Sequence, residues 1–507
     1  MKLKYLLPGL GIALASLATT SCSLDHEPLD RFSDITEGEL PTGEKVVFKD
    51  KAAVASHLKG MYQLMRDRQE HWFVDLLLIS DAHADNAYGG TTGAEVIPFE
   101  NNSVDGANSV LARDWQRYMS DMGVATRLIC NVDSVIDSNF SQEERNSYKA
   151  QALIFRAMVM FDVVRLWGDF PIVTQTPGDI TEDNIEEMYP VYFPKQNTEL
   201  EAYQQIEKDL MEALQYAPEN NPADKTLFTK SVARALLTKI YAEKPLRNYE
   251  KVISYADAVK ADGFELVNDF SDLFGMNEAV TDAKMRNTSE SILEAHFFSG
   301  SGNWATWMFG MDLTNPNNNW TWAKWVTPSR DLIKAYENEG DEVRFREAIV
   351  FYECDWSNYY PSNHYPFMYK LRSAYSSIIK YRLADIMLLK AEALIMKDAP
   401  ELEEAANIID EIRKRAGLGK LPNAVRSDKD QMVDALLKER RLELAFEGQR
   451  WFDLVRLNKV EEVMNAVYRK DSGRKAQVNP FNNYSYRLPI PQTVLDKNEN
   501  MVQNPGY

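Results

Sequence analysis

Five of the ten tryptophans gather in one stretch of the chain, at Trp304, Trp307, Trp320, Trp322 and Trp325. Asparagines are interspersed among them, at position 303 and in the run from 315 to 319. Aromatic rings match the apolar C–H faces of sugar rings, and nearby amides can bond the hydroxyl groups. The cluster therefore predicts carbohydrate recognition. For any single tryptophan, packing into a loop-rich core is an alternative that the sequence leaves open.

Spacing within the cluster suggests which rings face a ligand. Trp320 and Trp322 alternate by two, so in an extended segment both side chains lie on the same side. We expect these two, with Trp304 and Trp307, to contact the ligand. Trp325 would then point away and pack inward.

Groups that could catalyse a reaction or bind a metal form no recognisable pattern. Asp81, His83 and Asp85 alternate, but no second cluster completes a metal site. Asp269 and Asp272 offer oxygen ligands for a structural calcium ion, and the sequence does not decide whether they bind one. The chain has no nucleophile elbow, phosphate loop or zinc-spaced cysteine pair. We expect a binding protein rather than an enzyme, with no cofactor and no metal.

Residues 1–21 have the pattern of a secretory signal peptide. Lys2 and Lys4 begin it, an apolar run follows to Ala18, and that run is too short to span a bilayer. The sequence Thr19-Thr20-Ser21-Cys22 resembles a bacterial lipobox, with Thr19 where leucine is usual. We expect Cys22 to carry lipid as the first residue of the mature protein. The alternative is an ordinary cleavage site with an incidental cysteine.

Composition narrows the range of partners. The 507-residue chain has a formal net charge of −19, and the mature chain −21, because the signal contains two lysines and no acidic residue. Such a protein binds nucleic acid and anionic membranes poorly. Uronate-rich or sulfated ligands are also disfavoured unless a local basic patch overrides the overall charge. Cys130 and Cys354 can pair in an oxidising compartment or remain as buried thiols.

Apolar residues recur at helical spacing in both halves of the chain. The segments with this pattern are 150–164, 203–214, 232–242, 249–259, 383–395 and 405–416. Successive helix pairs suggest a degenerate tetratricopeptide-like solenoid, although no strict period of 34 residues is present. Between 264 and 375 the periodicity fades, and we expect loops and short strands packed on the helices.

The predicted fold is therefore mainly α, a tetratricopeptide-like scaffold of helical pairs with a loop-rich, partly β ligand-binding lobe. Its parts are the signal peptide (1–21), the lipidated cysteine and a polar tether (22–50), an N-terminal helical part (51–263), the lobe (264–375) and a C-terminal helical part (376–507).

The segment ERRLELAFEGQRWFDLVR, residues 439–456, combines many charges with aromatic residues. Its charged residues Glu439, Arg440, Glu443 and Glu447 are three or four positions apart, which places them on one helix face where they can pair. Gly448 permits a sharp exit from that helix, and Arg450 follows it. We expect a structural ion network that fixes the terminal helix to the scaffold.

This segment resembles the C-terminal signature of the SusD/RagB family, nutrient-binding outer-membrane lipoproteins of the Bacteroidota. Further family-like pieces occur in the same order along the chain, within residues 80–86, 156–171, 209–214, 340–344 and 381–393. The resemblance covers nearly the whole mature chain.

The resemblance implies a function. Family members capture oligosaccharides and pass them to a SusC-like TonB-dependent barrel transporter, and contact the membrane only through their lipid. An acidic patch after Cys22 resembles a surface-export signal, which favours exposure at the cell surface. The family's ligand site combines an early loop with the middle lobe, which adds Asn86 and Tyr88 to the expected contacts. A non-glycan nutrient such as a peptide remains the alternative, and the sequence does not identify the glycan.

Overall fold

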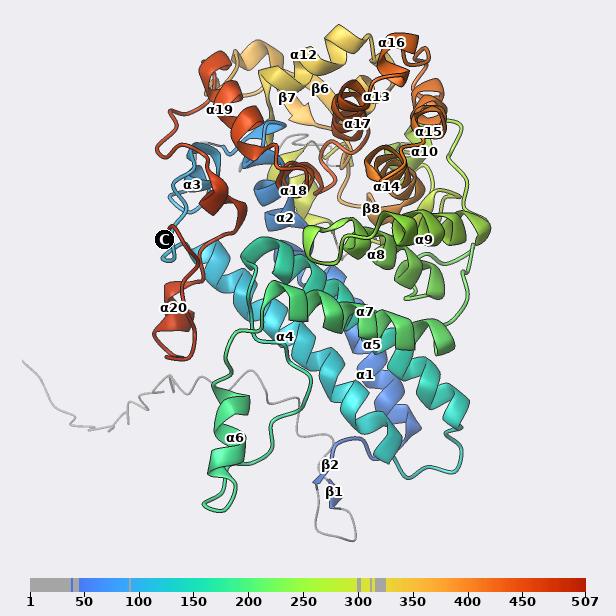
Figure 1. Cartoon of the computed structure of the whole chain (residues 1–507), viewed down its shortest axis with the longest axis vertical. Coiled ribbons are helices and arrows are strands. Elements are labelled where there is room, and N and C mark those ends of the chain that lie inside the picture. The colour runs from blue at the N-terminus through green and yellow to red at the C-terminus, as the bar shows by residue number, and fades with distance from the viewer. Residues whose placement is uncertain (1–37, 40–44, 91–92, 299–301, 311, 315–324) are drawn as a thin grey trace, which may run out of the picture.

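The computed structural model describes residues 38–39, 45–90, 93–298, 302–310, 312–314 and 325–507 (Figure 1). Cys22 and the signal peptide lie outside these residues, as do Trp320 and Trp322. Within the described ranges, no helix combines the length and apolarity needed to cross a bilayer.

The N-terminal half is a row of helices in which each packs against the next (Figure 1). The helices are α1 (Lys51–Asp67), α4 (Ser109–Asn131), α5 (Gln142–Trp167), α7 (Glu199–Tyr216), α8 (Lys230–Ala242) and α9 (Tyr249–Ala261). They confirm the predicted segments between 150 and 259. The second half of α5 is buried on every side, not on one face, because it lies in the middle of the row.

Local signals explain where these helices begin and end. Ser141 and Glu144 form a capping box at the start of α5, and Gly168 ends that helix with a φ of 77°. Buried charge also joins neighbouring helices. The guanidinium of Arg156 on α5 donates two hydrogen bonds of 2.7 and 2.8 Å to Asp209 on α7.

The C-terminal half contains α14 (Leu383–Met396), α15 (Leu402–Arg415), α16 (Asn423–Arg426), α17 (Lys429–Glu443), α18 (Arg450–Arg456), α19 (Val460–Lys470) and α20 (Gln492–Leu495). Helix α14 packs against α8 and α9 on one side and α15 and α17 on the other, so it joins the two halves. Residues 383–395 and 405–416 are helical, as predicted.

The lobe contains short strands and short helices, several of which lie next to the C-terminal helices at the top of the view (Figure 1). Its elements, with the strand β8 that follows it, are α10 (Ser271–Phe274), β4 (Ser291–Ala295), α11 (Trp304–Phe309), β5 (Thr327–Pro328), α12 (Arg330–Glu339), α13 (Glu342–Ala348), β6 (Ile349–Tyr352), β7 (Tyr365–Met368) and β8 (Ile378–Arg382). The prediction of loops and strands alone missed α12 and α13. Ser329 caps α12 and Gly340 ends it in the left-handed conformation, signals that were present in the sequence.

The strand pairs of the lobe are antiparallel: β6 with β7, β4 with β8, and β5 with β3 (Ala87–Tyr88) from the N-terminal half. The remaining elements are β1 (Gly38–Glu39), β2 (Lys45–Val46), η1 (Glu70–Val74), α2 (Asp75–Leu77), η2 (Leu78–Ala82), α3 (Ile97–Asn101), η3 (Val132–Ser134), α6 (Ile185–Tyr192), η4 (Lys244–Leu246), η5 (Ser362–His364) and η6 (Asn483–Tyr486). The part boundaries expected at 263 and 375 stay predictions.

Candidate functional site

The charged residues of segment 439–456 form a buried ion network, as predicted. Glu443, at the end of α17, accepts hydrogen bonds from Arg344, Arg382 and Arg415, which belong to three other elements. Arg382 also binds Glu447 at 2.6 and 2.8 Å. This network is structural because it ties α17 to the lobe, to β8 and to α15.

The expected pairing along one helix face is wrong, however. Helix α17 ends at Glu443, so Glu447 lies in the following turn, where Gly448 has a φ of 74°. Arg440 binds Asp385 and Asp453 on α14 and α18 instead of its neighbours on α17. Glu439 accepts from Arg344 on α13. Partners on other elements satisfy these charges better than neighbours do, because the whole face is buried.

The same segment also holds the early loop. Arg450 donates two hydrogen bonds, of 2.7 and 2.8 Å, to Asp85. Asp81 accepts from the backbone N–H of Phe446 at 3.0 Å and from Asn86 at 2.8 Å. The Nδ1 atom of His83 lies 2.6 Å from the carbonyl oxygen of Phe99. Asp81, His83 and Asp85 thus have separate partners, and among the described residues no three potential ligands gather around a metal position.

Asn86 and Tyr88 are fully buried, which does not support their expected direct contact with ligand. The Tyr88 ring stacks on Tyr359 at a centroid distance of 4.6 Å, and its hydroxyl donates to Asp471 at 2.7 Å. Asn86 accepts from the Arg441 guanidinium at 2.9 Å. Both side chains therefore hold the early loop in place. Their burial has no local signal in the sequence, because the covering residues come from distant segments.

Trp304 is the aromatic residue of the cluster that the structure places at the surface. Its side chain is 49% exposed, and its backbone N–H donates to Gln69 at 2.7 Å. Asn303 caps α11 by accepting from the N–H of Thr306 at 3.1 Å, and it donates to the carbonyl oxygen of Ser376 at 2.9 Å. These bonds hold the first turn of α11 in place, so the indole is presented on a rigid base.

The other tryptophans of the cluster give different outcomes. Trp307 lies in α11, but the structure does not describe its side chain. Trp320 and Trp322 fall outside the described residues, so their contact with ligand stays a prediction. Trp325 is half-buried and packs against the main core, as expected.

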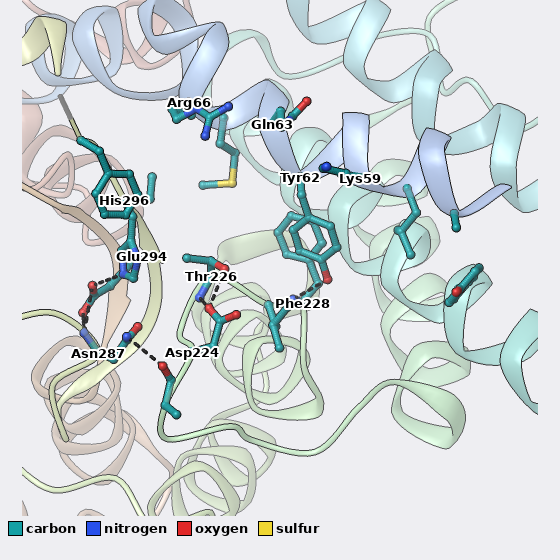
Figure 2. Close-up of a pocket in the computed structure, with 18 residues that line it drawn as sticks. Lys59, Tyr62, Gln63, Arg66, Asp224, Thr226, Phe228, Asn287, Glu294 and His296 are labelled. Carbon is teal, nitrogen blue, oxygen red and sulfur yellow. Dashed lines mark hydrogen bonds and ion pairs between the residues drawn. The ribbon is translucent and has the colours of Figure 1, made fainter. Parts of the chain in front are cut away.

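A pocket of about 630 Å³ opens between α1, the loop before α8 and the end of β4 (Figure 2). We call it the α1 pocket, and its labelled lining residues are Lys59, Tyr62, Gln63, Arg66, Asp224, Thr226, Phe228, Asn287, Glu294 and His296. Its volume is typical of small-ligand sites. Sequence reasoning missed it because three distant segments build it.

One wall of the α1 pocket is aromatic. The rings of Tyr62 and Phe228 stack at a centroid distance of 4.3 Å and an angle of 11°. The Tyr62 hydroxyl donates to Gln151 at 2.7 Å and accepts from the Phe228 N–H at 2.9 Å, so the ring has a fixed orientation. Burial raises the pKa of Tyr62, which keeps the hydroxyl neutral.

The opposite wall is built around Glu294. Its carboxylate accepts from the backbone N–H of Asn287 at 3.1 and 3.2 Å and lies 2.9 Å from the Nε2 atom of His296. Burial alone would raise the pKa of Glu294, but hydrogen bonds from His296 and Ser291 outweigh it and lower that pKa. The Glu294 carboxylate is therefore charged at neutral pH and occupied in holding this wall.

Phe298 forms an exposed rim of the α1 pocket, with 50% of its surface accessible. The Arg286 guanidinium lies 4.9 Å from the Phe298 ring centroid, and the His296 ring meets its edge at 6.2 Å. Arg286 is itself held by Asp282 at 2.6 Å. The rim ring is therefore supported on two sides.

Two further expectations concern calcium and cysteine. Lys284 forms ion pairs of 2.9 and 2.6 Å with Asp269 and Asp272, so an ammonium group already neutralises the proposed calcium ligands. The Lys284 hydrogen bond is the main reason that the pKa of Asp269 falls to about 2. Cys130 is exposed and Cys354 buried, and the structure forms no disulfide between them.

Comparisons with known proteins agree with this fold. The family model described as "SusD family" matches residues 363–507, and one described as "Starch-binding associating with outer membrane" matches residues 29–242. SusD-like protein P2 of Formosa agariphila is 25% identical over 497 residues, which cover 91% of this chain and 93% of that protein.

Solved structures with the same fold include a laminarin binding SusD-like protein. It has a TM-score of 0.68 and 22% identity, and the match covers 91% of this chain and 100% of that chain. Surface glycan-binding protein A from Bacteroides fluxus has a TM-score of 0.72 and 19% identity, with coverage of 90% and 99%. The sequence matches at both ends and the shared mainly α fold lead to one conclusion: the chain belongs to the SusD-like protein family.

Proposed function

We propose that this protein is a surface glycan-binding lipoprotein of the outer membrane. It captures oligosaccharides and delivers them to a partner TonB-dependent barrel transporter. The description of one matching family as starch-binding and associated with the outer membrane supports this proposal. The laminarin-binding and glycan-binding proteins that share the fold also support it.

Trp304 is the observation that carries the proposal. Among the tryptophans whose side chains the structure describes, it alone is about half exposed. It lies on a helix held by side-chain and backbone hydrogen bonds, so little ordering is required when a sugar ring stacks on it. Its neighbourhood in sequence contains the asparagines that can bond sugar hydroxyls.

Glycan binding is tested by titrating the mature protein against a panel of polysaccharides by calorimetry. Covering about 100 Å² of apolar ring surface is worth about 2 kcal/mol, so Trp304→Ala lowers the affinity by at least about tenfold. Tyr484→Ala is the matched control, because Tyr484 is 52% exposed but lies near the C-terminus of the chain. The Tyr484→Ala variant is expected to bind glycans with the affinity of the wild type.

Two results would overturn this function. The first is binding of peptides with no binding of any glycan, which would favour the peptide alternative. The second is a Trp304→Ala variant that binds every glycan as tightly as the wild type.

The transporter partner follows from the family resemblance, which implies that the protein covers a barrel as a lid. A large outer-membrane protein is expected to co-purify with it in mild detergent. Recovery of the monomer alone after gentle cross-linking on cells would argue against this part of the proposal.

A further inference from the structure

The α1 pocket is a second place where a ligand can bind, separate from the Trp304 surface. Phe298 at the pocket rim and Trp304 are six residues apart in the sequence. The last turn of α1 lies between them, since Arg66 lines the pocket and Gln69 accepts from the Trp304 N–H. A bound oligosaccharide that extends across this turn can contact both places.

Hydrogen-bond donors line the α1 side of the pocket. Lys59, Gln63 and Arg66 are spaced by four and three residues, so they lie along one face of the helix (Figure 2). Within the described part of the chain, Lys59 and Gln63 have no hydrogen-bond or ion-pair partner, and Arg66 contacts only its neighbour Asp67. These donors are therefore available to a ligand.

The two acidic groups of the pocket accept hydrogen bonds from neighbouring residues. Both oxygens of Glu294 accept hydrogen bonds, and the side chain is only 3% exposed. Asp224 accepts from the Thr226 N–H at 2.9 Å and from its hydroxyl at 2.6 Å through one oxygen. The donors left for a ligand on the α1 side are Lys59, Gln63 and the terminal nitrogens of Arg66, while one carboxylate oxygen of Asp224 remains as an acceptor on the other side.

Between these walls the Tyr62 ring, backed by the buried Phe228, gives a flat apolar surface of fixed orientation (Figure 2). A ligand that fits has one apolar face, several oxygen acceptors and a negative charge that meets Lys59. On the basis of the proposed glycan-binding function, we propose that the α1 pocket binds a uronate residue of an acidic oligosaccharide. The donor row on α1 is then the local basic patch that counters the acidic charge of the chain.

The test uses pairs of oligosaccharides that differ only in charge. Tetramers of galacturonate, glucuronate and mannuronate are titrated beside their methyl esters, which keep the rings and linkages and lack the negative charge. At least one acid is expected to bind more tightly than its ester. Raising the salt from about 0.1 M to about 1 M shortens the Debye length from about 10 Å to about 3 Å and reduces that preference.

Variants assign the preference to the pocket. Lys59→Gln is expected to lower the affinity for the acid about fivefold, because an exposed ion pair contributes at most about 1 kcal/mol. The affinity for the uncharged ester is expected to stay unchanged. Lys334→Gln is the matched control, an exposed lysine on α12 outside the pocket. Asp224→Asn does not weaken binding of the acid, whereas it would weaken binding of a zwitterionic peptide held between the two walls.

The outcomes separate this inference from the proposed function. The uronate assignment is overturned if no acid binds better than its ester, or if Lys59→Gln keeps the full preference. Glycan binding that depends on Trp304 would survive either result. A tetrapeptide that binds in a Lys59- and Asp224-dependent way, while all uronates fail, would also overturn the assignment.

Discussion

Glu443 is a residue at which several elements of the buried charge network meet. Its carboxylate accepts from three arginines, and its side chain is fully buried. Replacing it by glutamine removes a buried negative charge that the three guanidinium groups share, and leaves each of them with only its other carboxylate partners. Glu443→Gln is expected to lower the free energy of unfolding by about 3 kcal/mol, measured by urea denaturation at neutral pH. Glu186→Gln on exposed α6 is the control, with an expected change below about 0.5 kcal/mol.

The effect of Glu443 depends on pH in a defined direction. Burial alone would raise the pKa of Glu443, but Arg415, Arg382 and Arg344 outweigh it and hold that pKa well below its ordinary value. The unfolded chain therefore binds the proton first as the pH falls. The charged Glu443 therefore makes its full contribution to the free energy of unfolding above pH about 4.3, the ordinary pKa of a glutamate. That contribution is lost as the pH falls below this value. The difference between wild type and Glu443→Gln is expected to narrow in acid, and a constant difference would contradict this account.

A substitution at Tyr88 tests whether this side chain supports the early loop or contacts the ligand. Its hydroxyl donates to Asp471 and accepts from the backbone and side chain of Arg330, and burial raises its pKa to about 12. Tyr88→Phe leaves those buried partners unsatisfied and is expected to cost about 1–3 kcal/mol of stability. Glycan affinity of the folded variant is expected to stay unchanged in calorimetry. A weaker affinity at wild-type stability would restore Tyr88 as a ligand contact.

At the scale of single elements, α11 determines how Trp304 is presented. Asn303→Ala removes the cap on Thr306 and the bond to Ser376, which loosens the first turn. Glycan binding must then order this turn, which costs about 0.7 kcal/mol. The affinity is therefore expected to fall about threefold although Trp304 is still present. Asn248→Ala, which removes the equivalent cap of α9, is the matched control and leaves affinity unchanged. Equal affinities for the two variants would show that α11 needs no cap to present its indole.

Long helices were predictable because burial on a helix produces a regular apolar period. Helices α7, α9 and α15 bury one face in this way, whereas α5, α8 and α14 are buried on most sides. The lobe is different, since its elements are short and are stabilised by contacts between distant segments. Helix α11 is held by Gln69 and Ser376, and neither residue has a local signal near Trp304.

The ion network shows the same limit. The spacing of charges in segment 439–456 predicts that a network exists, because so many charges can be buried only when they are paired. It does not predict the partners, because Arg344, Arg382 and Arg415 lie outside the segment on three other elements. Nor could the α1 pocket be found, since its aromatic wall joins Tyr62 on α1 to Phe228 in the distant loop before α8.

At the scale of the whole molecule, the C-terminal segments pack against the N-terminal half. Arg450 binds Asp85, and the Trp167 indole donates to the carbonyl oxygen of Pro489 at 3.2 Å. Residues near both ends of the described chain thus share one core. A membrane anchor that does not disturb this core must lie in a part of the chain outside it. The stretch from Cys22 to Gly38 is suited to this, with a reach of at most about 55 Å when fully extended.

The lipid anchor gives a prediction for the protein in its cell. A single acyl chain binds a membrane only marginally, whereas several chains on one cysteine anchor it stably. Cys22→Ala is therefore expected to move the protein from the membrane fraction to the soluble fraction and to abolish labelling with palmitate. Cys130→Ala is the matched control, because it removes an exposed thiol on α4 and leaves both properties unchanged. Palmitate labelling that persists in Cys22→Ala would disprove the anchor. Loss of the protein on protease treatment of intact cells would place it on the outer face, while resistance would argue for the inner leaflet.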